Sequence, residues 1–234
     1  MIEFKGIAPE MIMLLAENRF NNSKIFYDEH KEEIKSGVTK QLYALISDLE
    51  PTLKKIDPEM CLIPSKMISR IRRDTRYTRD KSLYRENVWI MFMRHKKLWY
   101  HQPCMWFEMS PNGMNWGVGI YDCRPAVMER FRKKLDEKGE DFLKAADSAM
   151  KVGARPSFTL YKKDKSEGKD QRLKLYYNAK ELYFISPLYS LETLFDGRAE
   201  KQLEKAIKAY APMYKFLMEI TEEMLEEEGG ITNA

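Results

Sequence analysis

The chain lacks the features that mark disulfide-stapled, secreted and membrane-spanning proteins. It has only three cysteines in 234 residues, without paired close spacing, so neither a disulfide framework nor a four-cysteine zinc site is predicted. Its longest apolar runs, among them Val88 to Met93, are much too short to cross a bilayer, and Met1 to Lys5 has no signal-peptide pattern. We therefore expect a cytoplasmic protein with reduced thiols and no membrane association.

Motifs for nucleotide hydrolysis and for metal binding are also missing. No Gly-Lys-Ser or Gly-Lys-Thr occurs, so the P-loop class is not predicted. His95, His101, Cys104 and Cys123 follow no structural-zinc spacing, and each cysteine is more simply a small buried apolar residue. No metal site is predicted, the cofactor stays unspecified, and a Cys-His nucleophile pair is unconstrained by one sequence.

What the chain does contain is enough apolar material for a core. Hydrophobic residues make up 44% and aromatic residues 12%, which is far from the composition of disordered chains even though the mean hydropathy is −0.57. No Pro-, Gly- or Ser-rich linker divides the sequence. We expect one domain over 1–234, with a helical part at 1–58, a strand-rich part at 60–122 and a mainly helical part at 125–228.

The N-terminal part has helical periodicity. Apolar residues at helical spacing follow Pro9, and Asn21 to Ser23 then break and recap the helix. A second helix begins at Ser23, and a clear stripe from Leu42 to Leu53 predicts a third, which Pro51 and Asp57-Pro58 limit or kink.

The central part has strand signals that predict an antiparallel meander. All four tryptophans lie there, so we expect the sheet to carry much of the core. The predicted strands are Ser65–Arg73, Asn87–Arg94, Met105–Met109 and Trp116–Tyr121, the last two joined by the turn Pro111–Gly113.

The C-terminal part is mainly helical again, and the whole pattern is α+β rather than alternating α/β. A helix from Pro125 that continues beyond Gly139 is followed by a charged loop and shorter elements. The remaining predicted elements are a strand at Phe158–Tyr161, a loop at Lys162–Asp170, a short helix at Leu173–Asn178, a strand at Leu182–Ile185, and a helix at Ala199–Glu227 interrupted at Pro212 and stopped by Gly229-Gly230.

One basic segment stands out from an otherwise slightly acidic chain. The net charge is +4, yet residues 66–85 alone have a balance of +6, which leaves −2 for the remainder. If Met67 to Arg73 is extended, Arg70 and Arg72 point the same way, about 7 Å apart. Guanidinium forks at that spacing suit one phosphate or carboxylate between them.

Three explanations of this segment stay open. The arginines form an anion site, or they form an internal salt-bridge network with Asp74, Asp80 and Glu86, or they are a solvated edge that protects a sheet from aggregation. The excess of cations over acids favours the anion site over the network.

Several short motifs in and near this segment form a pattern found elsewhere. They are Asn21-Asn22, Tyr27-Asp28, Lys31, the stretch Arg70 to Tyr77, Asp80-Lys81 and Tyr84-Arg85. The pattern resembles a family of conserved proteins catalogued as domain of unknown function 2461, whose hallmark is an Arg-Asp-Thr-Arg-aromatic core followed by Asp-Lys and Tyr-Lys. The likeness continues weakly through Phe107, Pro111, Gly117, Gly119 and Arg132.

Departures from the family pattern are mild and leave the charges in place. Tyr77 stands where the family usually has Phe, Leu83 where it often has Pro, and Arg85 where it has Lys. The resemblance implies a single-domain cytosolic α+β protein and brings no established activity.

We therefore expect a module that binds an anionic, phosphate- or carboxylate-bearing ligand. The predicted ligand-binding residues are Arg70, Arg72, Arg73, Arg76, Lys81, Asn21 and Asn22, with Asp74 orienting the guanidiniums. Asn21 and Asn22 are also expected to cap a helix. The alternatives are an enzyme acting on a phosphorylated small molecule, with Asp74 or Asp80 as base and Tyr84 as acid, nucleic-acid binding, or a purely structural arginine network. The oligomeric state is not predicted.

Overall fold

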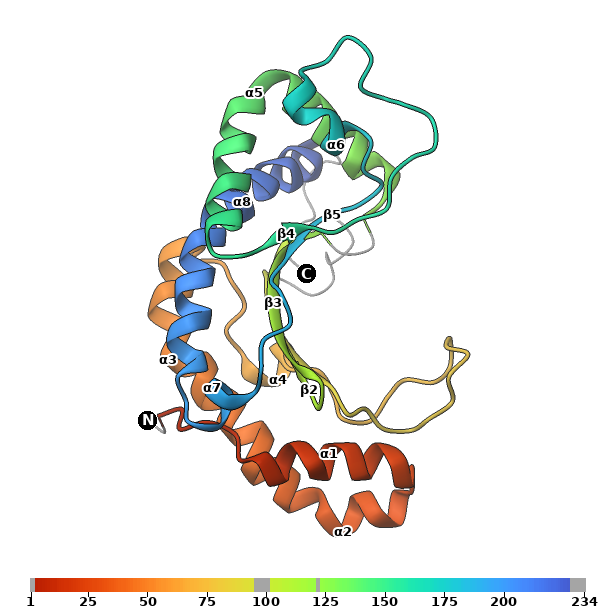
Figure 1. The fold of residues 1–234 in the computed structure, drawn as a ribbon, viewed down its shortest axis with the longest axis vertical. Helices are drawn as coiled ribbons and strands as arrows, with labels where there is room; N and C mark the ends of the chain where they lie inside the picture. The colour runs from red at the N-terminus through yellow and green to blue at the C-terminus, as the bar shows by residue number, and fades with distance from the viewer. Residues whose placement is uncertain (1–2, 95–101, 121–122, 228–234) are drawn as a thin grey trace. The chain divides into compact units, whose positions relative to one another are not determined.

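The computed structural model describes residues 3–94, 102–120 and 123–227 (Figure 1). Helices occupy both ends of the chain and an antiparallel sheet occupies its middle, so the α+β prediction is confirmed. The chain falls into two compact units. Unit 1 comprises Met1–Phe92, Trp106–Asn115 and Leu188–Lys205, and unit 2 comprises Met93–Met105, Trp116–Pro187 and Ala206–Ala234. The single-domain organisation stays a prediction.

Unit 1 begins with a helical hairpin that matches the predicted helices. Helix α1, Pro9–Asn21, starts with proline in its first turn and ends at Asn22, whose left-handed φ of 48° turns the chain. Ser23 then caps helix α2, Lys24–Ile34, by accepting a hydrogen bond from the Phe26 amide. The short break therefore folds α2 back alongside α1 (Figure 1).

Helix α2 runs into helix α3, Lys40–Ile56, through a π-helical turn, Lys35–Thr39, that was not predicted. A Cβ atom on Gly37 would lie 2.3 Å from the Met11 sulfur, so a larger residue in the turn would require the flexible Met11 side chain of α1 to move. The predicted stripe of α3 is buried, with Leu45, Leu49 and Leu53 fully enclosed. Pro51 lies inside the helix, which ends only at Ile56.

The sheet has five strands in the order β1-β2-β3-β5-β4. They are β1 Val88–Phe92, β2 Cys104–Ser110, β3 Gly113–Ile120, β4 Arg155–Pro156 and β5 Leu182–Ile185. The predicted meander is correct for β1 to β3, and β5 then pairs antiparallel with β3. Buried methionine, phenylalanine and aliphatic side chains of β2 and β3 supply the core, namely Met105, Phe107, Met109, Met114, Val118 and Ile120.

Two predicted strands and the predicted role of the tryptophans need correction. Ser65–Arg73 begins within a helical turn, α4 Pro64–Met67, because Pro64 favours a helix start, and only single bridges follow it. Phe158–Tyr161 forms one bridge, from Leu160 to Ala179. Among the tryptophans, Trp116 is buried, the indoles at 89 and 106 are partly exposed, and Trp99 lies outside the described residues.

Unit 2 contains the long helix α5, Pro125–Lys151, and most of helix α8, Ala199–Glu227. Helix α5 bends at Lys138, where φ is −131°, and continues beyond Gly139 as predicted. The predicted interruption at Pro212 is wrong, because α8 continues through it and a proline removes only one helical hydrogen bond at this position. Gly229-Gly230 lies outside the described residues. A 3₁₀ turn, Gln171–Leu173, and α6, Lys174–Tyr177, form the predicted short helix.

A short helix in unit 1, α7 Glu192–Phe195, was not predicted and holds the start of the chain. The Ile7 amide donates to the Leu194 carbonyl at 3.0 Å. Gly6 has a φ of +97°, and a Cβ atom there would lie 2.3 Å from the Phe195 carbonyl oxygen.

Within the described residues, none of the helices has both the length and the apolar stretch that a bilayer crossing requires.

Candidate functional site

The basic segment 69–85, here called the arginine arm, forms an antiparallel hairpin in unit 1. Arg72 pairs with Tyr84, and two backbone hydrogen bonds flank that pair, from the Arg73 amide to the Leu83 carbonyl at 2.8 Å and from the Arg85 amide to the Ile71 carbonyl at 3.0 Å. Residues 74–83 form the connecting loop. Figure 1 shows the arm in yellow, extending from the sheet along the α1–α2 hairpin.

The pairing of the arm is offset from that of the sheet. A second bridge joins Ile68 to Ile90, in the middle of β1. Four positions separate Ile68 from Arg72, whereas six separate Tyr84 from Ile90, so the returning strand carries two extra residues between the two bridges. Extra residues of this kind bend a strand and increase its twist. The arm therefore leaves the sheet at a bulge.

Two contacts anchor the arm on the α1–α2 hairpin. The Tyr84 side chain is 1% exposed and stacks on Tyr27 of α2, with 4.8 Å between ring centroids. At the turn between the helices, the Asn22 Oδ1 accepts a hydrogen bond from the Leu83 amide at 2.6 Å. One strand of the arm is thus fixed by an aromatic pair and by the residue that reverses the helices.

Asp80 is the centre of an ion-pair network inside the arm. Its carboxylate accepts hydrogen bonds from Arg73, from Arg19 of α1 at 3.0 Å, and from the amide and hydroxyl of Ser82 at 2.9 Å and 2.7 Å. These bonds, those from Ser82 foremost, hold the pKa of Asp80 well below its usual range. This part of the arm is the predicted structural network.

A second, smaller unit holds the tip of the loop. Asp74 accepts a forked hydrogen bond from Arg76, with the Nη2 to Oδ2 distance 2.6 Å and the Nε to Oδ1 distance 2.9 Å. Hydrogen bonds from Arg76 lower the pKa of Asp74 to about 2. The same guanidinium lies 5.5 Å from the centroid of the Tyr77 ring. Asp74 therefore orients one guanidinium, as predicted, and that guanidinium is 73% exposed.

The remaining cations of the arm are open to solvent. Arg70, Arg72 and Arg79 are exposed, and no carboxylate of the described chain lies within ion-pair distance of them. The Lys81 ammonium donates to the Thr75 carbonyl at 2.8 Å, which leaves its charge uncompensated. The arm is thus divided between internally paired and free cations.

The structure separates the predicted site residues by role. Arg73 is paired and only 17% exposed, so it supports the arm from within. The Asn21 amide donates to the Glu17 carbonyl within α1, and Asn22 ends that helix and bonds the arm. Tyr84, the predicted acid, is buried, and desolvation raises its pKa.

Some residues that build the arm were missed in the sequence. Arg19 reaches Asp80 across 61 positions, and nothing in its local pattern signals that contact. Ser82 was also missed, although a serine two residues after an aspartate commonly bonds that carboxylate. That local signal would have identified Asp80 as a loop-forming residue.

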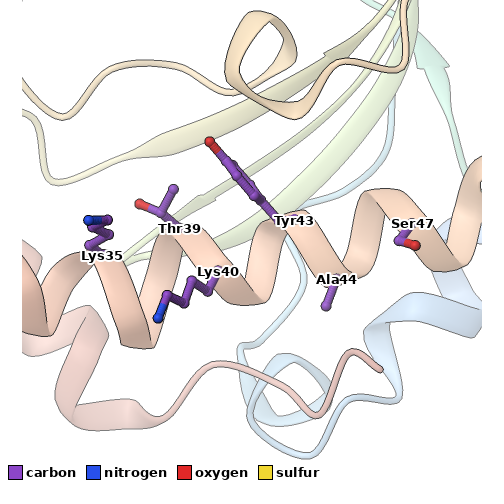
Figure 2. Close-up of a pocket in the computed structure, with 6 residues that line it drawn as sticks. All are labelled: Lys35, Thr39, Lys40, Tyr43, Ala44 and Ser47. Carbon is purple, nitrogen blue, oxygen red and sulfur yellow. The ribbon is translucent and has the colours of Figure 1, made fainter. Parts of the chain in front are cut away.

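A hollow on α3 lies apart from the arm in sequence and lining. It has a volume of about 400 Å³. Figure 2 shows its side chains along the π-helical turn and α3: Lys35, Thr39, Lys40, Tyr43, Ala44 and Ser47. The Lys35 ammonium is paired with Glu32 of α2 at 3.4 Å. Because the lining contains no member of the arm, this hollow supplies no pocket for the Asp74 or Asp80 carboxylates.

The described residues offer no clustered metal ligands. No group of three histidine, cysteine, aspartate or glutamate side chains within ranges 3–94, 102–120 and 123–227 is arranged to hold an ion. His95 and His101 lie outside those ranges. Cys104 is enclosed, and burial raises the pKa of its thiol to about 12, which disfavours the thiolate that a metal or a nucleophilic reaction requires.

Comparison with known proteins identifies the family of the chain. No match to the chain is found among curated proteins. A family model described as "Conserved hypothetical protein (DUF2461)" matches residues 10–216 of the 234, a range that contains the helical hairpin, the arm and the sheet. The chain therefore belongs to the DUF2461 family of conserved hypothetical proteins.

Proposed function

We propose that the protein is a binding module for an anionic ligand that carries phosphate or carboxylate groups, and that the arginine arm is its binding element. The observation behind the proposal is that Arg70, Arg72 and Arg79 are exposed and have no carboxylate partner in the described part of the chain. Charges left free beside an ordered network attract counter-ions, and planar guanidiniums bind oxyanions through two parallel hydrogen bonds.

The arm supports this proposal because it is braced before any ligand arrives. Tyr84 is packed against α2, and Arg72 is its cross-strand partner, so the backbone that carries Arg72 is fixed. Arg70 lies two residues earlier in the same arm, before a bend at Ile71. A ligand that meets two guanidiniums on an ordered backbone loses less conformational entropy on binding than one that must order a loop.

Binding is favoured over the enzyme alternative by the states of the acids. A general base acts best when its pKa is near the working pH. The pKa of Asp74 is about 2, lowered by Arg76, and that of Asp80 is held low by Ser82 and Arg73. Both carboxylates are already engaged by donors of the arm itself. A purely structural network explains Arg73 and Arg76, but not the exposed cations.

A thermal-shift and calorimetric comparison of variants tests the proposal. The probes are inorganic pyrophosphate, citrate and a panel of phosphorylated metabolites. Arg72→Ala is expected to weaken binding roughly tenfold to hundredfold, since a hydrogen bond to a charged group contributes about 1.5–3 kcal/mol. Its melting temperature without ligand is expected to equal that of the wild type, because within the described chain no ion pair of the Arg72 side chain supports the fold.

The matched control is Arg198→Ala. Arg198 is an exposed arginine of the same unit, paired with Asp196 at 2.7 Å, and its removal changes the net charge equally. Full ligand binding by this variant is expected. The proposal is wrong if no anion stabilises the wild type, or if Arg198→Ala weakens binding as much as Arg72→Ala does.

A cytoplasmic location is part of the same proposal. It rests on the sequence, whose three cysteines have no disulfide spacing and suit a reducing compartment.

A further inference from the structure

Two large aromatic side chains stand in solvent at the arm. Phe20, in the last turn of α1, and Tyr77, in the loop, are each 89% exposed, more than any other large hydrophobic residue of the described chain. Arg19 and Asn22 lie on either side of Phe20 in sequence, and both contact the arm, through Asp80 and Leu83. Tyr77 therefore lies in the same loop as the free Arg79, and Phe20 lies in the helical turn whose neighbouring residues contact the arm.

The Tyr77 ring is held in place although it is exposed. Arg76 lies over it at 5.5 Å, and Asp74 fixes Arg76 through a forked pair of hydrogen bonds. This small stack orders the ring without covering it. An ordered, solvent-facing ring in a basic loop has no role in packing, and it presents a flat surface to a partner.

From this combination we infer that the anionic ligand is single-stranded nucleic acid, an inference that rests on the proposed function of the arm. Single strands are recognised by cations that follow the phosphate backbone and by aromatic rings on which successive bases stack. Arg70, Arg72 and Arg79 supply the cations, and Tyr77 and Phe20 supply the rings. A free phosphate or small carboxylate would bind the arginines alone and would not contact the exposed rings.

Two other partners fit the surface less well. In a duplex the bases are stacked on each other, so exposed rings at the arm would find no base face to cover. A membrane surface is also anionic, but a flat surface in contact with the arm would also contact the helices beside it. Helix α2 exposes four acids, Asp28, Glu29, Glu32 and Glu33, against two exposed lysines, Lys24 and Lys31, and so repels an anionic bilayer.

Fluorescence anisotropy with labelled oligonucleotides tests the inference on the full chain. The probes are oligo(dT), oligo(U), a duplex of the same length, and unlabelled inorganic polyphosphate as a competitor without bases. We expect the single strands to bind more tightly than the duplex. Tyr77→Ala is expected to weaken their binding roughly fivefold to hundredfold, the range found when one base loses its stacking partner. Phe20→Ala is expected to weaken it similarly, while Tyr77→Phe keeps the ring and the affinity.

Salt dependence separates the arginines from the rings. For a single strand, removing one cation that neutralises a phosphate reduces the slope of log affinity against log salt by about 0.7. Arg70→Ala and Arg72→Ala are each expected to reduce that slope, whereas Tyr77→Ala leaves it unchanged. The control Tyr43→Ala removes a partly exposed ring from α3, outside the arm, and is expected to bind like the wild type.

The outcomes distinguish this inference from the proposed function. If pyrophosphate or a phosphorylated metabolite binds through Arg72 but oligonucleotides do not, the inference is wrong and the proposed function stands. Equal competition by polyphosphate and oligonucleotide, with no effect of Tyr77→Ala, overturns it too, as does binding only to phosphatidylserine vesicles. If none of these probes binds, both are wrong.

Discussion

Asn22 allows the attachment of the arm to the helices to be measured directly. The residue does two things: it adopts the left-handed conformation that ends α1, and its side chain accepts the Leu83 amide at 2.6 Å. Substitution by glycine keeps the first role and removes the second. Substitution by alanine removes both, because an alanine strains in the left-handed region.

The expected losses of unfolding free energy follow from these two roles of Asn22. Removing one backbone-to-side-chain hydrogen bond costs about 1 kcal/mol of unfolding free energy, so Asn22→Gly is expected to be destabilised by about that amount. The left-handed conformation adds about 1–2 kcal/mol for alanine, so Asn22→Ala is expected to lose about 2–3 kcal/mol. Urea unfolding measures both variants, and Asn21→Ala is the control because Asn21 bonds only within α1.

Hydrogen exchange gives the readout specific to the arm. The Leu83 amide is expected to exchange faster in both Asn22 variants and at the wild-type rate in Asn21→Ala, because only Asn22 accepts that amide. If Leu83 stays equally protected in Asn22→Gly, the side chain does not anchor the arm and the reasoning fails. A glycine variant less stable than the alanine variant would refute the assignment of the two terms.

Three further predictions concern other parts of the chain. Gly6→Ala is expected to lose more than about 3 kcal/mol in urea unfolding, because the residue has a positive φ and the new methyl group would clash with the backbone. Gly168→Ala is the control: its φ is also positive, but nothing lies within 4 Å of the new methyl group, so a loss of only about 1–2 kcal/mol is expected. Equal losses for the two variants would contradict the clash at Gly6. The Asp74 carboxyl is expected to titrate near pH 2 in an NMR titration of its side-chain carbon, so its ion pair with Arg76 persists at neutral pH and breaks as pH falls from about 4 towards 2. Arg76→Gln is expected to move the midpoint of the Asp74 titration up towards the ordinary value of 3.8. A wild-type midpoint already at 3.8 would exclude the ion pair. The Lys134 side chain is 3% exposed and is bonded to two half-exposed glutamates of α8. Lys134→Met is expected to cost less than about 1 kcal/mol of unfolding free energy and Lys134→Ala about 2–3 kcal/mol, because the glutamates stay hydrated in both variants and only the packing differs. Equal losses in urea unfolding would show that the ion pairs dominate.

Most of the regular structure could be predicted because its causes are local. The strand Leu182–Ile185 and the helix Ala199–Glu227 have the predicted limits, since alternation and helical periodicity are written in consecutive residues. The segment Phe158–Tyr161 misled for a non-local reason. Its one bridge joins Leu160 to Ala179, which lies in the turn after α6 and not in a strand.

The candidate site was predictable as a segment and not as an arrangement. Charge clustering located the arm, but Asp80 also bonds Arg19, which comes from another element. Trp89 was expected in the core, yet Arg85 lies 4.5 Å from its ring and the indole stays partly exposed. Which cation meets which partner is set by tertiary packing, which no local pattern records.

The two extra residues between the bridges of the arm and the sheet make the arm a separable module. An extra residue within a strand shifts the hydrogen-bond register between that strand and its neighbours. Here the register already changes between Tyr84 and Ile90. Loops of other lengths can therefore replace the tip, residues 75–79, without disturbing β1 or the contacts of Asp80 and Leu83, and the same scaffold can carry tips with different ligand preferences.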